Sequence, residues 1–154
     1  MDIGLVGLRN DVVARRLARA GVRVFGSDAE GRAEALAAES ILVALPDAVQ
    51  VAQALRAPRV AWLDLPTGFA TELAIQDIWP EFAPGDVIVD AGEGSAADAA
   101  RRTAALASVR IEFVACRVRV DAAGESIALD LDGNPAALGI LAPYVERVAG
   151  YHGA

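Results

Sequence analysis

The chain has 154 residues, of which 55% are hydrophobic and 23% charged, a composition typical of one globular domain. Its formal net charge of −7 argues against a nucleic-acid-binding protein, which usually carries a basic surface. The sequence has no apolar run long enough to cross a membrane, and Met1 begins a strand pattern without a basic leader. We therefore expect neither nucleic-acid nor membrane partners.

Two residue counts restrict the possible chemistry. Cys116 is the only cysteine, which excludes an internal disulfide and is typical of a reducing compartment, so we expect a cytoplasmic protein. All 14 basic residues are arginine, so no lysine is present to act as a general base or to form a Schiff base. The single histidine, His152, and the widely spaced carboxylates form no ligand motif, and we expect no metal.

Strands and helices are expected to alternate strictly through the first two thirds of the chain, on the evidence of hydrophobic spacing. The expected strands are residues 3–8, 22–26, 41–45, 60–65 and 87–90, and the expected helices are residues 12–20, 29–39, 46–55, 71–82 and 96–107. Asn10 or Asp11 is a plausible N-cap of the first helix, and Gly21 is placed to end it. Such alternation implies parallel strands joined by right-handed crossovers, with helices on both faces of the sheet.

The pattern changes after Ile111. Residues 111–120 and 126–131 have the character of two strands, and the polar turn at residues 121–124 separates them. Two strands joined by so short a turn predict an antiparallel β-hairpin. We expect this hairpin at one edge of the sheet.

A last helix follows, with Asn134 as its N-cap and Pro135 as its first residue. The expected fold class is therefore α/β: a Rossmann-like, doubly wound, mostly parallel sheet with a C-terminal β-hairpin and a final helix. We assign residues 1–149 to one dinucleotide-binding-type domain and residues 150–154 to a short tail.

The turn after the first expected strand is the usual place for a pyrophosphate in such a fold. A dinucleotide-binding fingerprint requires G-x-G-x-x-G at this turn, for tight turning and close backbone approach. Gly7 is present, but Leu8, Arg9, Asn10 and Asp11 follow it, so the second and third glycines are missing. Arg9 is able to contact a phosphate, whereas Asp11 adds negative charge where an anion would bind.

Asp28 follows the second expected strand, 21 residues after Gly7. A carboxylate at this place holds the adenosine ribose in many dinucleotide-binding domains, and an adjacent arginine would be needed for a 2′-phosphate. Ala29 supplies no arginine, so a cofactor bound here would be NAD rather than NADP. The alternative role for Asp28 is to cap the second helix, and both roles remain open.

Several short motifs follow one another at a specific spacing. They are IGLVGL at residues 3–8, PRVAWLDLPTG at 58–68, PGDVIVD at 84–90 followed by Ala91-Gly92, and Asp98 with Arg101-Arg102. With these motifs in this order, the chain up to about Ala149 resembles the N-terminal NAD(P)-binding domain of 6-phosphogluconate dehydrogenase and its β-hydroxyacid dehydrogenase relatives. The resemblance implies a Rossmann-type cofactor domain.

The resemblance also implies where a cofactor, NAD, would bind. The candidate cofactor-binding residues are Gly7, Leu8, Arg9, Asn10, Asp28, Leu65, Pro66, Thr67 and Glu93. The ligand expected there is a dinucleotide or another small anionic molecule. We assign no catalytic residue.

Several departures from the family pattern accompany these matches. The first turn is two residues shorter than the family's, and Glu93 stands where the family's G-G-N-S loop has asparagine. Residues 117–121 replace an S-G-G substrate-binding segment. The family's catalytic lysine belongs to a C-terminal helical domain, which we expect to be absent, and this chain has no lysine at all.

Three functions are compatible with these features. The departures favour a non-catalytic or accessory relative of 6-phosphogluconate dehydrogenase, in which nucleotide binding is weak or lost. The first alternative is an NAD-dependent oxidoreductase that acts on a small hydroxy acid, with a site completed by a partner chain. The second is a protein-interaction scaffold. In each case an apolar face without its helical domain would favour a homodimer or another protein partner.

Overall fold

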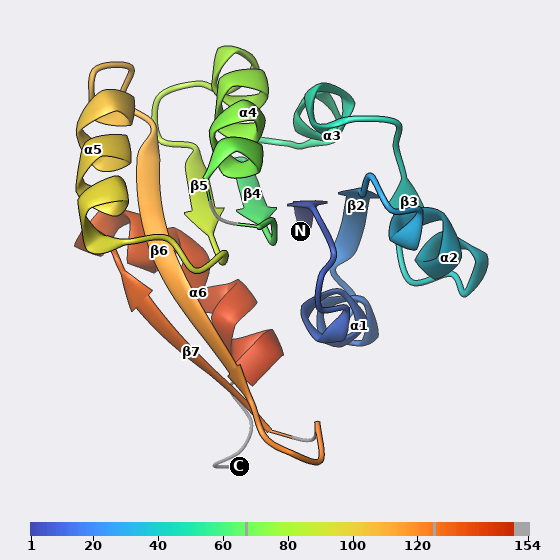
Figure 1. Ribbon diagram of the computed structural model, residues 1–154. Helices are drawn as coiled ribbons and strands as arrows, with labels where there is room; N and C mark the ends of the chain where they lie inside the picture. Colours follow the sequence, from blue (N-terminus) through green and yellow to red (C-terminus); the bar gives the residue numbers. More distant parts are fainter. Residues whose placement is uncertain (67, 125, 150–154) are drawn as a thin grey trace.

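The structure is a computed structural model that describes residues 1–66, 68–124 and 126–149. Its strands are β1 (Asp2–Val6), β2 (Arg23–Ser27), β3 (Val43–Ala44), β4 (Val60–Leu63), β5 (Val87–Asp90), β6 (Glu112–Val120) and β7 (Ile127–Asp132). They form one sheet in the order β3-β2-β1-β4-β5-β6-β7 (Figure 1). All neighbouring strands are parallel except β6 and β7, which pair antiparallel.

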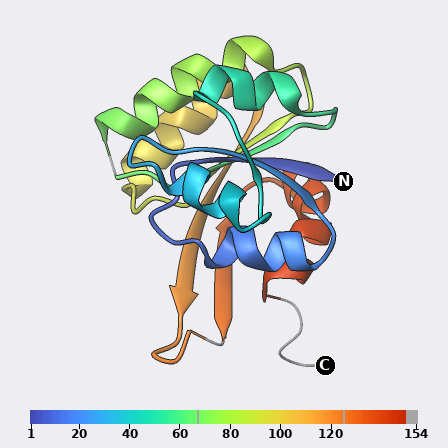
Figure 2. The same ribbon diagram turned by 90° about the vertical axis from the view of Figure 1, so that its right-hand side faces the viewer.

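Helices cover both faces of the sheet and make three layers (Figure 2). They are α1 (Val12–Arg19), α2 (Arg32–Ala38), α3 (Ala48–Ala54), α4 (Phe69–Ile78), a 3-10 turn η1 (Trp79–Glu81), α5 (Ala96–Ala107) and α6 (Pro135–Ala149). The buried side chains of α1, α2 and α6 belong to one apolar cluster, and those of α3, α4 and α5 belong to another. Because strand residues alternate between faces, the parallel strands other than the two-residue β3 each contribute to both clusters.

The strand order confirms the predicted Rossmann-like α/β fold. The chain runs outward from β1 through β2 to β3, then crosses back to place β4 on the other side of β1. β1 is therefore central, and Leu5 lies between Gly26 of β2 and Trp62 of β4. The crevice of a doubly wound sheet opens at this reversal, beyond the carboxyl ends of the strands. Among the described residues, no helix is long and apolar enough to span a membrane.

The predicted hairpin is confirmed at the far edge of the sheet, where Val118 of β6 is paired with Leu129 of β7. The hairpin extends well beyond the other strands (Figure 1). Helix α6 packs on the face of this hairpin, and the side chain of Asn134 caps its start by accepting a 2.8 Å bond from the Ala137 N–H. The hydroxyl of Tyr144 donates to the Asp2 carbonyl at 2.6 Å, which joins α6 to the first strand.

Element boundaries differ from the prediction where local backbone bonding competes with the hydrophobic pattern. Helix α2 begins at Arg32 rather than Ala29, because Gly31 has a positive φ of 79° and breaks the helical path. Strand β3 has two residues instead of five, since the Ile41 N–H closes the end of α2 on the Leu36 carbonyl. Helix α4 stops at Ile78, before a proline that cannot donate an N–H to the helix.

Candidate functional site at the strand-order reversal

A crevice of about 810 Å³ lies beyond the carboxyl ends of the central strands. One wall is the turn between β1 and α1, and the floor includes Trp62 and Asp64 at the end of β4. The loop of residues 91–95 after β5 forms a second wall, and the β6–β7 hairpin forms a third. Of the candidate cofactor-binding residues, Arg9, Asn10 and Glu93 line this crevice.

Gly7 brings the first turn into direct contact with the end of β4. Its φ is 81°, and its N–H donates to the Ser27 carbonyl of β2 at 2.8 Å. A Cβ atom at this position would lie only 2.3 Å from the carbonyl oxygen of Asp64. Residue 7 must therefore be glycine both for its backbone angle and for this close approach.

Asp28 is almost fully engaged with the backbone around it. Its carboxylate accepts hydrogen bonds from the N–H groups of Leu8, Glu30 and Arg32, each at 3.1 Å, and its side chain is only 5% exposed. These bonds join the first turn to the segment that begins α2. The predicted capping role is not borne out as stated, because the N-cap residue of α2 is Gly31, although Asp28 accepts from the first N–H of that helix, at Arg32.

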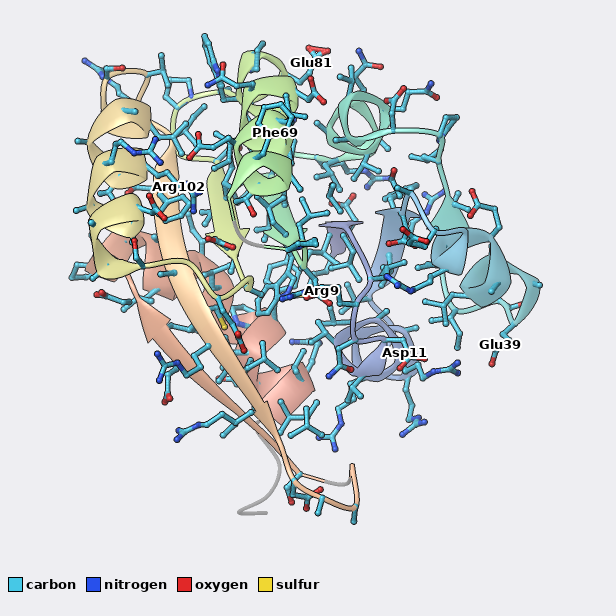
Figure 3. All side chains as sticks on the ribbon, viewed as in Figure 1. Arg9, Asp11, Glu39, Phe69, Glu81 and Arg102 are labelled. Carbon is cyan, nitrogen blue, oxygen red and sulfur yellow. The ribbon has the colours of Figure 1, made fainter. Side chains whose placement is uncertain are left out.

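Asp64 is the residue of the crevice that sequence reasoning missed. Its Oδ2 accepts a 2.8 Å bond from the Asn10 N–H, and its Oδ1 lies 3.1 Å from Arg9 Nε. Figure 3 shows Arg9 between α1 and the end of β4. A carboxylate directly after a buried apolar strand was the available signal, because side chains at that place face the crevice.

The start of α1 uses two further side chains of the turn. Asp11 is the N-cap residue of α1 but makes no side-chain capping bond, whereas Asn10 Oδ1 accepts from the Val12 N–H at 2.9 Å. Asp11 instead pairs with Arg15 at 2.7 Å, and Arg15 also makes a two-pronged bond to Glu39. The first N–H of α1 is therefore already bonded within the chain.

The loop after β5 is held by a buried ion pair. Asp90 accepts from the Gly92 N–H at 2.8 Å and from Arg102 Nη1 of α5 at 3.0 Å. Arg102 also donates to Glu72 of α4 at 2.8 Å. Burial raises the pKa of Asp90, while the Gly92 N–H and the Arg102 charge oppose that rise. Figure 3 shows Arg102 directed from α5 toward the sheet.

Glu93 lies exposed at the tip of this loop, on the wall of the crevice. Behind it, a Cβ at Gly92 would lie 2.6 Å from the Leu65 carbonyl, so the two loops touch through their backbones. The carbonyl of Pro66 accepts a 3.2 Å bond from Thr71 Oγ1. The candidate Thr67 lies outside the described residues, as do His152 and the rest of the tail.

The hairpin wall contributes Cys116 and charged side chains. Cys116 is buried, and desolvation raises its pKa to about 12. Arg119 pairs with Asp130 at 2.8 Å on the exposed side of the hairpin. Acidic side chains outnumber basic ones around the crevice: the acids are Asp64, Asp90, Glu93, Asp130 and Asp132, against Arg9 and Arg117.

Two backbone donors of the first turn are already engaged within the chain. The Leu8 and Asn10 N–H groups, which face a pyrophosphate in a dinucleotide-binding turn, already donate to Asp28 and Asp64. For metals, residues 1–66, 68–124 and 126–149 contain no group of three or more His, Cys, Asp or Glu side chains placed to hold an ion.

Comparison with known proteins decides the family. The sequence profile described as the NAD binding domain of 6-phosphogluconate dehydrogenase matches residues 2–128, which is most of the chain. The chain belongs to this family. The resemblance stated from its motifs is thereby confirmed.

Individual relatives of this 6-phosphogluconate dehydrogenase-type domain agree. The chain is 26% identical over 153 residues to an NAD(+)-dependent, decarboxylating 6-phosphogluconate dehydrogenase of Haloferax volcanii, covering 97% of this chain and 50% of that protein. It is 29% identical over 102 residues to a decarboxylating 6-phosphogluconate dehydrogenase of Caenorhabditis elegans, covering 65% of this chain and 21% of that protein. The chain thus spans half or less of the length of the curated relatives it matches.

Solved structures show the same fold. A 6-phosphogluconate dehydrogenase of Plasmodium falciparum superimposes with a TM-score of 0.88 at 20% identity, covering 99% of this chain and 35% of that one. A 3-hydroxyisobutyrate dehydrogenase of Mycobacterium tuberculosis superimposes with a TM-score of 0.85 at 25% identity, covering 97% of this chain and 52% of that one. The fold is therefore shared with one part of these dehydrogenases, about a third of the first and half of the second.

Proposed function

We propose that this domain is a non-catalytic or accessory relative of 6-phosphogluconate dehydrogenase, with weak or lost nucleotide binding. The observation that carries the proposal is the first turn, where the Leu8 and Asn10 N–H groups bond to Asp28 and Asp64. A dinucleotide would have to displace these carboxylates before its pyrophosphate reached the same donors. Each displacement exchanges a charge-assisted bond for another of the same kind, which leaves little net gain.

The residues around the reacting end of the crevice support the non-catalytic part of the proposal. Glu93 occupies the loop position where the family resemblance predicts an asparagine. An ionised carboxylate only accepts hydrogen bonds, whereas an amide also donates them. The chain itself also holds no lysine to accept the proton of a substrate hydroxyl.

Thermal unfolding with NAD, NADP and their reduced forms tests the proposal. A dissociation constant one hundredth of the ligand concentration would stabilise the fold by about 2.7 kcal/mol, or roughly 5–10 °C in a chain of this length. We expect shifts of less than about 2 °C at about 1 mM ligand. A shift of the larger size with any of the four ligands, or turnover of 6-phosphogluconate by the purified chain, would overturn the proposal.

The second candidate function is an NAD-dependent oxidoreductase for a small hydroxy acid, completed by a partner chain. It is favoured by the 26% identity, over nearly the whole of this chain, to the NAD(+)-dependent enzyme of Haloferax volcanii. A crevice of about 810 Å³ beside the loop of residues 91–95 leaves room for a second polypeptide to contribute groups. Reduction of NAD by the chain with 6-phosphogluconate or 3-hydroxyisobutyrate, seen only when a co-purified partner is present, would establish this function.

Self-association is part of the proposed function. Phe69 and Leu73 are 76% and 48% exposed, and they lie one helical turn apart on α4. Figure 3 shows Phe69 on the outer side of this helix. We propose that a second copy covers this apolar pair. Light scattering at tens of micromolar should give a dimer that Phe69→Ser converts to a monomer, with Val43→Ser on the distant β3 edge as the control; a wild-type monomer would contradict the proposal.

A further inference from the structure

We propose that Asp64 is a built-in anion at the first turn, and that its carboxylate weakens the binding of a diphosphate ligand in the crevice. The inference rests on the proposed weak nucleotide binding and assigns it to a residue. Asp64 directly follows β4. It lies 54 positions along the chain from Asn10, whose backbone N–H donates a hydrogen bond to it.

The contacts of Asp64 are those that a phosphate oxygen would make. One carboxylate oxygen accepts from the Asn10 backbone N–H at 2.8 Å, and the other lies 3.1 Å from Arg9 Nε. Both donors belong to the turn that leads into α1. Anions at a helix N-terminus are stabilised by such N–H groups and by the helix dipole, and an arginine adds a second charge-assisted bond. A side-chain carboxylate of the same chain occupies this place.

The backbone holds Asp64 in position on both sides. Its N–H donates to the Val6 carbonyl of β1 at 2.9 Å, and the preceding residue, Leu63, accepts from the Ala91 N–H at 2.8 Å. Its own carbonyl packs against Gly7, where no Cβ would fit. The carboxylate therefore starts from a fixed point of the sheet, with only two side-chain torsions left to adjust. Its side chain is 15% exposed, so little rearrangement is needed for solvent to reach it.

Charge decides the competition with a diphosphate. A diphosphate brings further negative charge to a place where Asp64 already neutralises Arg9. The two anions cannot share the same donors, and their mutual repulsion is weakly screened in a partly closed crevice. Removing the carboxylate frees the Asn10 N–H. It also leaves the positive charge of Arg9 without the neutralising charge of Asp64. The class of ligand that gains from this change is the diphosphate group, free or within a dinucleotide.

Two variants separate charge from occupancy. Asp64→Asn keeps the size of the side chain and one oxygen acceptor but removes the charge, whereas Asp64→Ala also frees the Asn10 N–H. Asp132→Asn is the matched control, because it removes one negative charge from the hairpin wall of the same crevice without touching the first turn. We expect diphosphate affinity to rise in the order wild type, Asp64→Asn, Asp64→Ala, with Asp132→Asn like the wild type.

The experiment is a calorimetric titration of each variant with inorganic pyrophosphate and with NADH, the latter also followed by its fluorescence. We expect Asp64→Ala to bind both ligands about tenfold or more tightly than the wild type, the gain from one charge-assisted bond. Circular dichroism checks the fold, and if Asp64→Ala is unfolded, the near-isosteric Asp64→Asn carries the test.

Each outcome has one meaning. Equal, weak binding by the wild type and both Asp64 variants overturns the role of Asp64 and leaves the proposed function standing. An equal gain in diphosphate affinity in Asp132→Asn also overturns the role of Asp64, because the gain would then come from the overall charge of the crevice. Micromolar binding of NADH by the wild type overturns the proposed function itself.

Discussion

Arg102 of α5 and Asp90 of β5 form an ion pair at 3.0 Å in which the side chains are only 3% and 6% exposed. The pair fixes the loop that carries Glu93, because the other Asp90 oxygen accepts from the Gly92 N–H. Buried pairs contribute little net stability when intact, but removing one partner leaves an uncompensated charge. The consequences of this arrangement can be measured.

Arg102→Met should lower the free energy of unfolding by roughly 3–5 kcal/mol, since Asp90 would remain buried without its partner. The control is Arg101→Met, next to it on the same helix and also bonded to Glu72, but 56% exposed, so that its loss should cost much less. Urea unfolding measures both. In the double variant Arg102→Met with Asp90→Asn, part of the loss should return; equal losses in the two single variants would contradict the argument.

Gly7→Ala should destabilise the domain more than Gly21→Ala. Both glycines have positive φ, 81° and 85°, which alone costs an alanine roughly 1–2 kcal/mol. Only at Gly7 would the new Cβ meet backbone, at 2.3 Å from the Asp64 carbonyl, while the space around Gly21 is open. Thermal unfolding should therefore show a larger loss for Gly7→Ala. Equal losses of stability in the two variants would mean that β1 and β4 separate easily at this point.

Glu72 should make the stability of the domain depend on pH. Hydrogen bonds from Arg101 and Arg102 lower its pKa in the folded protein. Because the folded pKa lies below the unfolded value of about 4.3, its contribution is present above that pH and is lost as the pH falls through the folded pKa.

Glu72→Gln should therefore be less stable than the wild type at pH 7, by roughly 1 kcal/mol or less after solvent screening. The two proteins should converge below about pH 4. Chemical unfolding at a series of pH values measures the difference. A gap that stays constant down to pH 3 would show that lost packing rather than charge explains the variant.

Cys116 should be inert in the folded protein although it lines the crevice. Burial raises the pKa of its thiol to about 12, and the nearby charges of Asp130 and Asp90 add to the rise. At pH 8 only about one thiol in ten thousand is then the reactive thiolate. Labelling with a thiol-specific reagent should be negligible at pH 8 and complete in denaturant. Prompt labelling of the native protein would mean that the hairpin opens.

The order and type of the elements follow from the sequence because hydrophobic spacing directly reports which side chains are buried. The strands at residues 87–90 and the helix at 96–107 have the predicted bounds, and the hairpin lies at the predicted edge. The observed boundaries differ from the prediction where a local feature of the backbone ends an element. The positive φ of Gly31 and the Ile41 bond to α2 shortened the predicted second helix and third strand.

The candidate site was likewise predicted only in part. Motif spacing placed Arg9, Asn10 and Glu93 at the carboxyl ends of the strands, where they line the crevice, since parallel strands bring all such ends to one edge. The hydrogen bond between Asp64 and the Asn10 N–H could not be predicted. The two residues are far apart in the sequence, and only the pairing of β1 with β4 brings them together.

The sequence by itself determined the Rossmann-like fold, the dehydrogenase-type family, and the absence of lysine chemistry from this chain. Only the tertiary structure decided what the surviving polar residues do. Asp28 is engaged by three backbone N–H groups and Asp64 by the turn before α1. The reason is physical: a hydrogen bond depends on distances of about 3 Å between atoms that the chain order leaves far apart.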